Sequence, residues 1–392
     1  MRSMIPTLLL AALVSLFVTG VRAQSPLDAV EGAPVSIGTF RLLHSEILGE
    51  DRPLLVSLPE DYEAGEASYP VLYVLYGDQV RGYFAEAVHA VERLSGEGSI
   101  PEMLVVGVAN LDRYRDLSPV GRRGGGSGVE PFAGFVEEEL VPFVDSEYRT
   151  KDYRVLMGPQ AGAGFAVYSL ATRPGLFDAC IIESPFAFPE LNEALAPMLD
   201  AIADEGLPSP TFLQVTWADR TGFQDRADSR GLVEAFEARV READPPNLTL
   251  VVNYVDGSED FLPPLRLKEG LRELFRGHRF PEDMGVRGLS DITDYYEELS
   301  GRIGFDIDVP TMTLAASANG LAMAGNTHAA IEILQYLVET HPASVDGHWQ
   351  LANIYRERGE RDKALGHYRK CLELLPNMPM VQRYIEELEG EE

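Results

Sequence analysis

Cysteine is scarce in this chain, whose 392 residues include only Cys180 and Cys371. One lies in an apolar segment typical of a strand and the other in a helical pattern some 190 positions later. The two fall in different predicted domains, which argues against a structural disulfide between them. We therefore expect two buried free thiols.

Basic residues are also few. Lys and Arg number 33 against 62 Asp and Glu, which gives a formal net charge of −29. So acidic a surface repels nucleic acid and anionic lipid, and neither is predicted as a partner. The chain also lacks a zinc-binding spacing, a phosphate loop and a dinucleotide fingerprint, so no metal and no cofactor is predicted.

Long apolar runs are confined to the first residues. The stretch 5–18 is mostly apolar, Arg2 precedes it, and the small residue Ala23 stands just before Gln24. This pattern predicts a signal peptide over 1–23, cleavage near Ala23, and a secreted or periplasmic protein. A membrane anchor is the alternative, which the short run disfavours. No other run is long enough to span a bilayer, so no stable membrane insertion is predicted.

Between residues 35 and 280, short apolar segments alternate with helical patterns. Segments such as 71–76 and 103–108 are continuously apolar, which is typical of parallel strands covered on both faces. The alternation predicts an α/β fold with a mostly parallel, doubly wound sheet that follows an opening antiparallel pair. The predicted strands are 35–40, 54–59, 71–76, 103–108, 154–158, 179–184, 211–217 and 248–255, and the predicted helices include 83–94, 131–144, 231–242 and 264–275.

Beyond residue 310 the pattern is helix after helix, with an internal repeat of 34 residues. Gly325, Ala330 and Pro342 return as Gly359, Ala364 and Pro376. This small, aromatic and proline framework resembles the tetratricopeptide repeat, with a weaker copy at 311–342 and a better one at 345–376. Unrelated helical hairpins are the alternative. Residues 378–390 are predicted to form a capping helix.

Several segments in fixed order connect the region 35–280 with a known family. They are Tyr69–Asp78, Val106–Asn110, Arg113–Pro119, Phe135–Asp145, Tyr148–Thr150, Pro174–Asp178 and Glu183–Pro185. Together they resemble the esterase family of α/β-hydrolases that includes enterochelin-esterase-like and S-formylglutathione-hydrolase-like enzymes. The resemblance implies the α/β-hydrolase fold. It also implies a serine nucleophile, a histidine base and an acid that orients the base.

The chain departs from that family at both reacting positions. Gly158-Pro159-Gln160-Ala161-Gly162 stands where the family has its nucleophile elbow, with Gln160 at the position of the serine. A carboxamide has no hydroxyl or thiol that could attack a carbonyl. The family histidine follows the last strand, but residues 256–263 contain none, and Glu259 aligns with its position to within a residue or two. Asp219 is a candidate relic of the orienting acid, with an exposed loop acid as the alternative.

Backbone N–H groups at the turns of the degenerate site can still donate hydrogen bonds to a ligand. An oxyanion hole would use the N–H of Ala161 and one near Gly77 and Asp78, because these donors depend on the chain path. With Pro159 and Gln160 they form a candidate pocket for a small carbonyl or carboxylate ligand. A cation site is the alternative use of this edge of the sheet. It would draw on the acids that follow the strands, namely Asp78, Asp112, Asp116, Glu259 and Asp260.

These observations predict a signal peptide (1–23), an esterase-like domain (24–285), a linker (286–310) and two repeats with a capping helix (311–392). The leading hypothesis is a catalytically degenerate esterase homologue that binds a ligand or a protein, with the repeats as the surface for a protein or peptide partner. An active carboxylic-ester hydrolase with an unconventional site is the second hypothesis. A structural partner of an active paralogue is the third.

Overall fold

The structure is a computed structural model. It describes residues 36–60, 62–63, 65–77, 82–120, 127–183, 189–218, 227–255, 263–281 and 284–390. From Ile37 onward the chain forms one compact unit. The predicted signal peptide and the positions of Asp78, Asp219, Glu259 and Asp260 lie outside the described residues.

An eight-stranded sheet forms the centre of the first domain, in the order β1-β2-β4-β3-β5-β6-β7-β8. β1 and β2 pair with antiparallel register, as do β2 and β4, and every other neighbouring pair is parallel. This confirms the predicted fold class. The strands are β1 (Thr39–Ser45), β2 (Glu50–Ser57), β3 (Tyr69–Leu75), β4 (Leu104–Val108), β5 (Thr150–Pro159), β6 (Ala179–Glu183), β7 (Thr211–Ala218) and β8 (Leu248–Val255).

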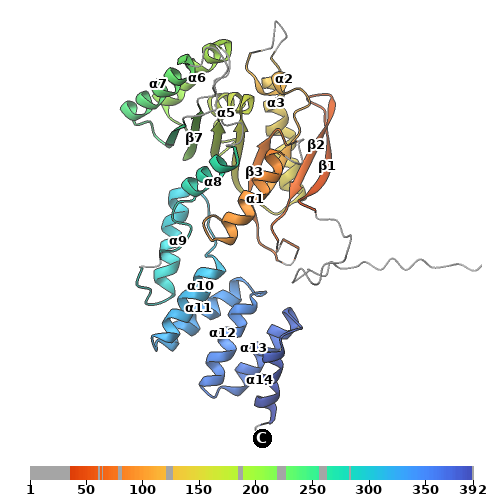
Figure 1. Cartoon of the computed structure of the whole chain (residues 1–392), viewed down its shortest axis with the longest axis vertical. Coiled ribbons are helices and arrows are strands. Elements are labelled where there is room, and N and C mark those ends of the chain that lie inside the picture. Colours follow the sequence, from red (N-terminus) through yellow and green to blue (C-terminus); the bar gives the residue numbers. More distant parts are fainter. Residues whose placement is uncertain are drawn as a thin grey trace, which may run out of the picture. The chain divides into compact units, whose positions relative to one another are not determined.

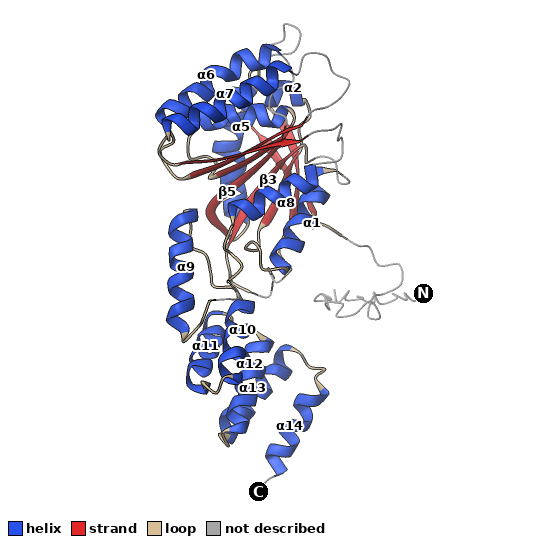
Figure 2. Ribbon diagram, turned by 60° about the vertical axis from the view of Figure 1, so that its left-hand side comes forward, coloured by secondary structure: helices blue, strands red, loops and turns tan. Residues whose placement is uncertain are grey.

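Helices cover both faces of the sheet (Figure 2). One face packs against α1 (Tyr83–Gly96) and α8 (Pro263–Leu274), which also contact each other. The opposite face carries the remaining helices of this domain. They are α2 (Arg113–Leu117), α3 (Val129–Phe135), α4 (Val141–Glu147), α5 (Ala161–Thr172), α6 (Pro189–Glu205) and α7 (Ala227–Ala243).

One predicted helix contains a local widening. The segment predicted as a helix over 131–144 is helical from Val129 to Glu147, with a π-helical turn at Val136–Leu140 between α3 and α4. Pro142 has no N–H to donate and its ring clashes with the carbonyl four residues earlier in a regular helix. The extra residue in the preceding turn removes this conflict, because it shifts the hydrogen bond of Val141 to the carbonyl of Val136.

The predicted linker 286–310 contains the helix α9 (Leu289–Ile303), so most of it is regular structure. Its buried face carries Ile292, Tyr296 and Leu299, which belong to the same apolar cluster as α1 and α8. The hydroxyl of Tyr296 donates to the carbonyl of His278 at 2.8 Å and lies 3.1 Å from the hydroxyl of Thr313. α9 therefore packs on both the helices before it and those after it.

The C-terminal part is built from helical hairpins, drawn in blue in Figure 1. α10 (Thr311–Met323) pairs with α11 (Thr327–Thr340), and α12 (Val345–Glu357) pairs with α13 (Arg361–Leu374). The predicted capping helix is α14 (Pro379–Gly390). Gly325 and Gly359, one repeat length apart, both have positive φ (82° and 73°) at the turns inside the hairpins. The repeat in the sequence is thus a repeat in backbone conformation.

No helix among the described residues is long and apolar enough to cross a membrane. Both cysteines are buried, and neither is in a disulfide, as predicted.

Candidate functional site: a nucleophile elbow that carries glutamine

Gln160 stands alone between the end of β5 and the start of α5. Its backbone has φ 53° and ψ −116°, a conformation with positive φ outside the left-handed helical region that a residue with a side chain rarely adopts. The N–H of Gln160 donates to the carbonyl of Glu183 at 3.1 Å, and its carbonyl accepts from the N–H of Ala163 at 3.1 Å. These bonds hold the residue at the apex of a sharp turn, the geometry that presents a nucleophile in α/β-hydrolases.

Gly158 is needed for this turn. A Cβ atom on Gly158 would lie 2.6 Å from the carbonyl oxygen of Gly162, because the helix folds back closely over the strand. Pro159 is buried, whereas Gln160 and Ala161 remain partly exposed. The elbow is therefore intact as a backbone structure, with its strained residue a glutamine.

A second turn follows β3 and faces the same edge of the sheet. Tyr76 also has positive φ (60°), and its N–H donates to the side-chain oxygen of Asn110 at 2.9 Å. Gly77 donates to the carbonyl of Val108 at 2.9 Å, and a Cβ on it would lie 2.4 Å from the backbone of Gly107. The N–H groups of Tyr76 and Gly77 are thus already engaged.

Because the N–H groups of Tyr76 and Gly77 are engaged, fewer N–H groups remain as candidate donors of an oxyanion hole. The N–H of Ala161 stands at the first position of α5, where a helix offers no intrahelical acceptor. A second donor would have to come from Asp78 or a residue after it. Gly77 therefore shapes the turn through its close approach to β4, and it contributes no free donor.

Two of the acids proposed for the cation site, Asp112 and Asp116, lie among the described residues. Asp116 is fully buried and both its oxygens accept from arginines: Arg52 Nη1 at 2.7 Å and Arg115 Nε at 2.7 Å. Asp112 caps α2, accepting from the N–H groups of Tyr114 and Arg115. Within the described residues no group of three His, Cys, Asp or Glu side chains could hold a metal ion.

Arg52 is the centre of a buried ion network that fixes this edge of the sheet. Its guanidinium is fully buried, donates also to Glu50 at 2.5 Å and to the carbonyl of Ala109 at 3.1 Å, and lies against the ring of Phe132. Hydrogen bonding from Arg115 is the main cause that lowers the pKa of the Glu50 carboxyl. The network ties β2 to α2. Helix α2 lies within Arg113–Pro119, one of the segments that carry the family resemblance.

Arg266 was not among the predicted site residues. It lies on α8, just after the loop where the family has its histidine. Its side chain lines a very small cavity of about 10 Å³ together with Pro159 and Glu183, and it pairs with Glu269. The cavity has room for about one water molecule. Only the position of Arg266 at the start of the terminal helix could have signalled this proximity.

The histidines are placed away from the elbow. His44 lies on the edge strand β1, four strands from β5, which is roughly 19 Å at the usual strand spacing, and it contacts Asp51 at 2.7 Å. His278 contacts the carbonyl of Gly98 at 3.0 Å, beyond the end of α1. His89 is exposed on α1, and the other four, His328, His341, His348 and His367, lie in the repeat domain.

Comparison with known proteins places the chain in a family. The model of the "Putative esterase" family matches residues 45–301, well over half of the chain, and a tetratricopeptide-repeat model matches residues 345–378. The protein is thus an α/β-hydrolase of the esterase family, fused to tetratricopeptide repeats. Both predicted resemblances are confirmed.

Individual relatives are distant. The chain is 29% identical over 159 residues to the uncharacterized protein YjcH of Bacillus subtilis, and 29% identical over 139 residues to the ferri-bacillibactin esterase BesA of the same organism. These matches cover 38% and 30% of this chain, and 62% and 48% of the relatives. An IroE-like serine hydrolase from Shewanella oneidensis superposes with a TM-score of 0.64 at 25% identity, covering 77% of this chain and 99% of that one.

Proposed function

We propose that this esterase-family protein no longer hydrolyses esters and acts by binding. The observation that carries the proposal is Gln160 at the apex of the intact elbow, where a serine would have to stand. Acyl transfer needs a nucleophile and a base that deprotonates it. The chain lacks a hydroxyl or thiol at the apex, and residues 256–263 hold no histidine.

The first test is an ester assay. With short-chain p-nitrophenyl esters, the wild-type chain is expected to show no turnover above the uncatalysed rate, and the Gln160→Ala variant is expected to match it. Gln160→Ser restores the hydroxyl without the base, whose contribution is typically about 10²–10⁴-fold, so it should gain little. Wild-type turnover that persists unchanged in Gln160→Ala would instead support a hydrolase with an unconventional site.

We also propose a ligand for the elbow itself, a small molecule with a carbonyl or carboxylate. The N–H of Ala161 at the first position of α5 and the partly exposed Gln160 carboxamide support this proposal, because both can donate hydrogen bonds to such an oxygen. A thermal-shift screen with small acids and esters tests it. A screen in which no compound shifts the melting temperature of the wild type more than that of Gln160→Ala would refute it.

A protein or peptide partner of the repeats is the third part of the proposal. Tetratricopeptide repeats commonly mediate protein interactions, and α10 exposes two large apolar side chains, Met312 and Met323. Methionine is common on surfaces that accept varied partners. A structural role beside an active paralogue would use the same surface. Co-purification from the native source, with the export signal intact, tests both roles. The compartment in which the protein is found tests the proposed secretion.

The repeat helices also predict how stability depends on pH. Burial lowers the pKa of His341, His348 and His367. His348 and His367 join α12 to α13 through ring nitrogens 2.9 Å apart, and the other nitrogen of His348 lies 3.1 Å from the carbonyl of Pro342. Because the folded state disfavours their protonated forms, their contribution to stability is fully present above about pH 6.5, the unfolded value.

This contribution is lost as pH falls from 6.5 toward the lowered pKa values of the folded state. We expect the urea midpoint to decrease between pH 7.5 and pH 5.5. The double variant His348→Gln/His367→Gln should show a smaller decrease, and its comparison with the wild type removes the opposite contribution of Asp178, whose pKa burial raises. Equal slopes in the two proteins would contradict the assignment.

A further inference from the structure

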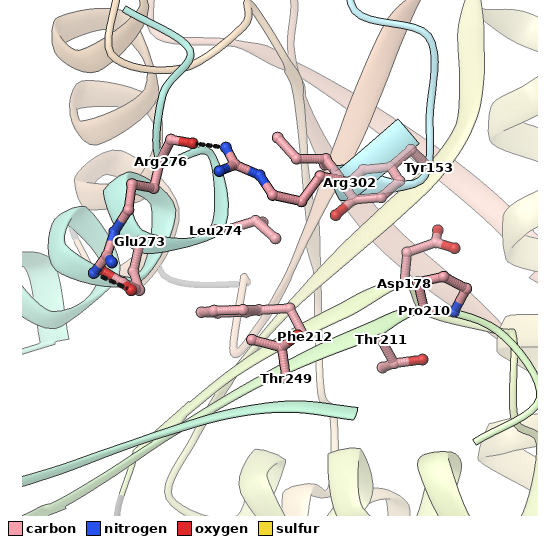
Figure 3. Close-up of a pocket in the computed structure, with 11 residues that line it drawn as sticks. Tyr153, Asp178, Pro210, Thr211, Phe212, Thr249, Glu273, Leu274, Arg276 and Arg302 are labelled. Carbon is pink, nitrogen blue, oxygen red and sulfur yellow. Dashed lines mark hydrogen bonds and ion pairs between the residues drawn. The ribbon is translucent and has the colours of Figure 1, made fainter. Parts of the chain in front are cut away.

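A cavity among the described residues lies at the edge of the sheet opposite the elbow. It has a volume of about 180 Å³ and opens between the amino ends of β5–β8 and the last turns of α8 and α9 (Figure 3). An engineered cavity of about 150 Å³ is large enough to bind benzene. The cavity at this edge, which we call the amino-edge cavity, therefore has room for a small organic ligand.

Four polar side chains at or next to the amino ends of the strands line this cavity, namely Tyr153, Asp178, Thr211 and Thr249. Tyr153 is 2% exposed and its hydroxyl, directed into the space in Figure 3, has no hydrogen-bond partner in the part of the chain that is described. Asp178 precedes β6, and one of its carboxylate oxygens accepts from the N–H of Arg154 at 2.7 Å. Burial is the main cause that raises the pKa of this carboxyl, and the nearby charge of Arg154 offsets that effect only in part.

The helical wall supplies a positive charge. Arg302, on the last turn of α9, donates to the carbonyl of Arg276, and no described carboxylate pairs with it. Arg276, by contrast, pairs with Glu273. Figure 3 shows the Arg302 guanidinium and the Asp178 carboxylate on different sides of the cavity, with the apolar side chains of Leu274 and Phe212 below and between them.

We propose that the amino-edge cavity binds a small zwitterion of the α-amino acid class with an apolar side chain. Its ammonium group donates to Asp178 and to the oxygen of the Tyr153 hydroxyl, its carboxylate accepts from Arg302, and its side chain packs on Phe212 and Leu274. Each polar group of such a ligand meets a group of the opposite charge or hydrogen-bonding sense.

The position of the site has a consequence for the rest of the molecule. Tyr153 lies on β5 and Asp178 directly precedes β6, whereas Arg302 belongs to the helix α9 that leads into the repeats. A bound ligand joins the two, and it stabilises only the state in which α9 is docked on the sheet. The site is independent of the elbow, which lies at the carboxyl ends of the same strands.

Isothermal titration calorimetry of the full-length chain with three probes of one carbon skeleton tests the proposal. The probes are L-valine, isobutylamine, which lacks the carboxylate, and 3-methylbutanoate, which lacks the ammonium group. Each charge-assisted contact corresponds to about a tenfold change in affinity or more, so valine should bind at least about tenfold more tightly than either partial probe. No valine binding at about 10 mM, or equal binding of all three probes, overturns the proposal.

Variants locate the binding. Arg302 is exposed, so Arg302→Gln should not disturb the fold. Because this variant loses the contact to the carboxylate, its affinity for valine should fall to that for isobutylamine. Tyr153→Phe keeps the ring that packs 4.4 Å from Phe305 between centroids, and it should weaken valine and isobutylamine alike. Arg287→Gln, two residues before the start of α9, is the matched control and should bind valine as the wild type does. Unchanged valine affinity in both Arg302→Gln and Tyr153→Phe would place the ligand elsewhere and overturn the proposal.

Discussion

Replacing Asp116 by alanine is expected to lower the free energy of unfolding by about 3–5 kcal/mol. Asp116 is buried, and its carboxylate accepts from both Arg52 and Arg115. Its removal leaves the fully buried guanidinium of Arg52 with one carboxylate, Glu50, that is itself shared with Arg115. A buried charge that loses its partner costs much more than the pair contributes when intact.

Urea denaturation followed by circular dichroism measures this effect. Asp308→Ala is a suitable control, because Asp308 is 62% exposed and pairs with Lys151 at the surface. Such surface pairs contribute about 0–1 kcal/mol. If Asp116→Ala were no more destabilising than Asp308→Ala, the network would be dispensable, and another cause would have to hold α2 against β2.

Gly77→Ala is expected to destabilise the fold by about 1–3 kcal/mol or more, although it adds a single methyl group. The new Cβ would lie 2.4 Å from backbone atoms of Gly107 and Val108, which cannot rotate away as a flexible side chain could. β3 and β4 would have to separate at the turn that leads to the candidate oxyanion donors. Ligand binding at the elbow should therefore weaken together with stability.

Gly96→Ala provides the matched comparison. Gly96 is the last residue of α1, and a Cβ on it would meet nothing within 4 Å. Alanine is favoured over glycine in helices by about 1 kcal/mol, so this variant should be neutral or slightly stabilised. Equal melting temperatures for the two variants would show that the close approach at Gly77 relaxes without cost.

The last two strands of the sheet were predictable almost to the residue. The predicted strand 248–255 is β8, and 211–217 is β7 without its last residue. Both segments are rich in β-branched and aromatic residues, which favour strands, although β8 is an edge strand with no fully buried residue. The opening strand was placed too early: β1 is Thr39–Ser45, because Ser45 closes a turn with the N–H of Gly49 and this turn sets the register with β2.

The elbow could be recognised from sequence because its requirements are local. The close approach of α5 to β5 requires a glycine at Gly158, two residues before Gln160. Arg266 and the amino-edge cavity could not be recognised in this way. Both depend on how α8 and α9 dock against the sheet, and Arg302 lies 124 positions from Asp178. Helix α6 was missed as well, since Pro197 inside it reads as a helix breaker.

The apolar cluster shared by the sheet and the repeats has a consequence for how the two parts can evolve. It runs from Leu55 on β2 to Leu388 on α14, with Tyr296 and Leu314 among the side chains that connect them. A module whose side chains are also part of its neighbour's core cannot be exchanged as freely as a domain that is joined by a flexible linker. Replacing the repeats would therefore remove side chains from the core that the sheet shares with them, and changes in the sheet and in the helices are expected to compensate for one another.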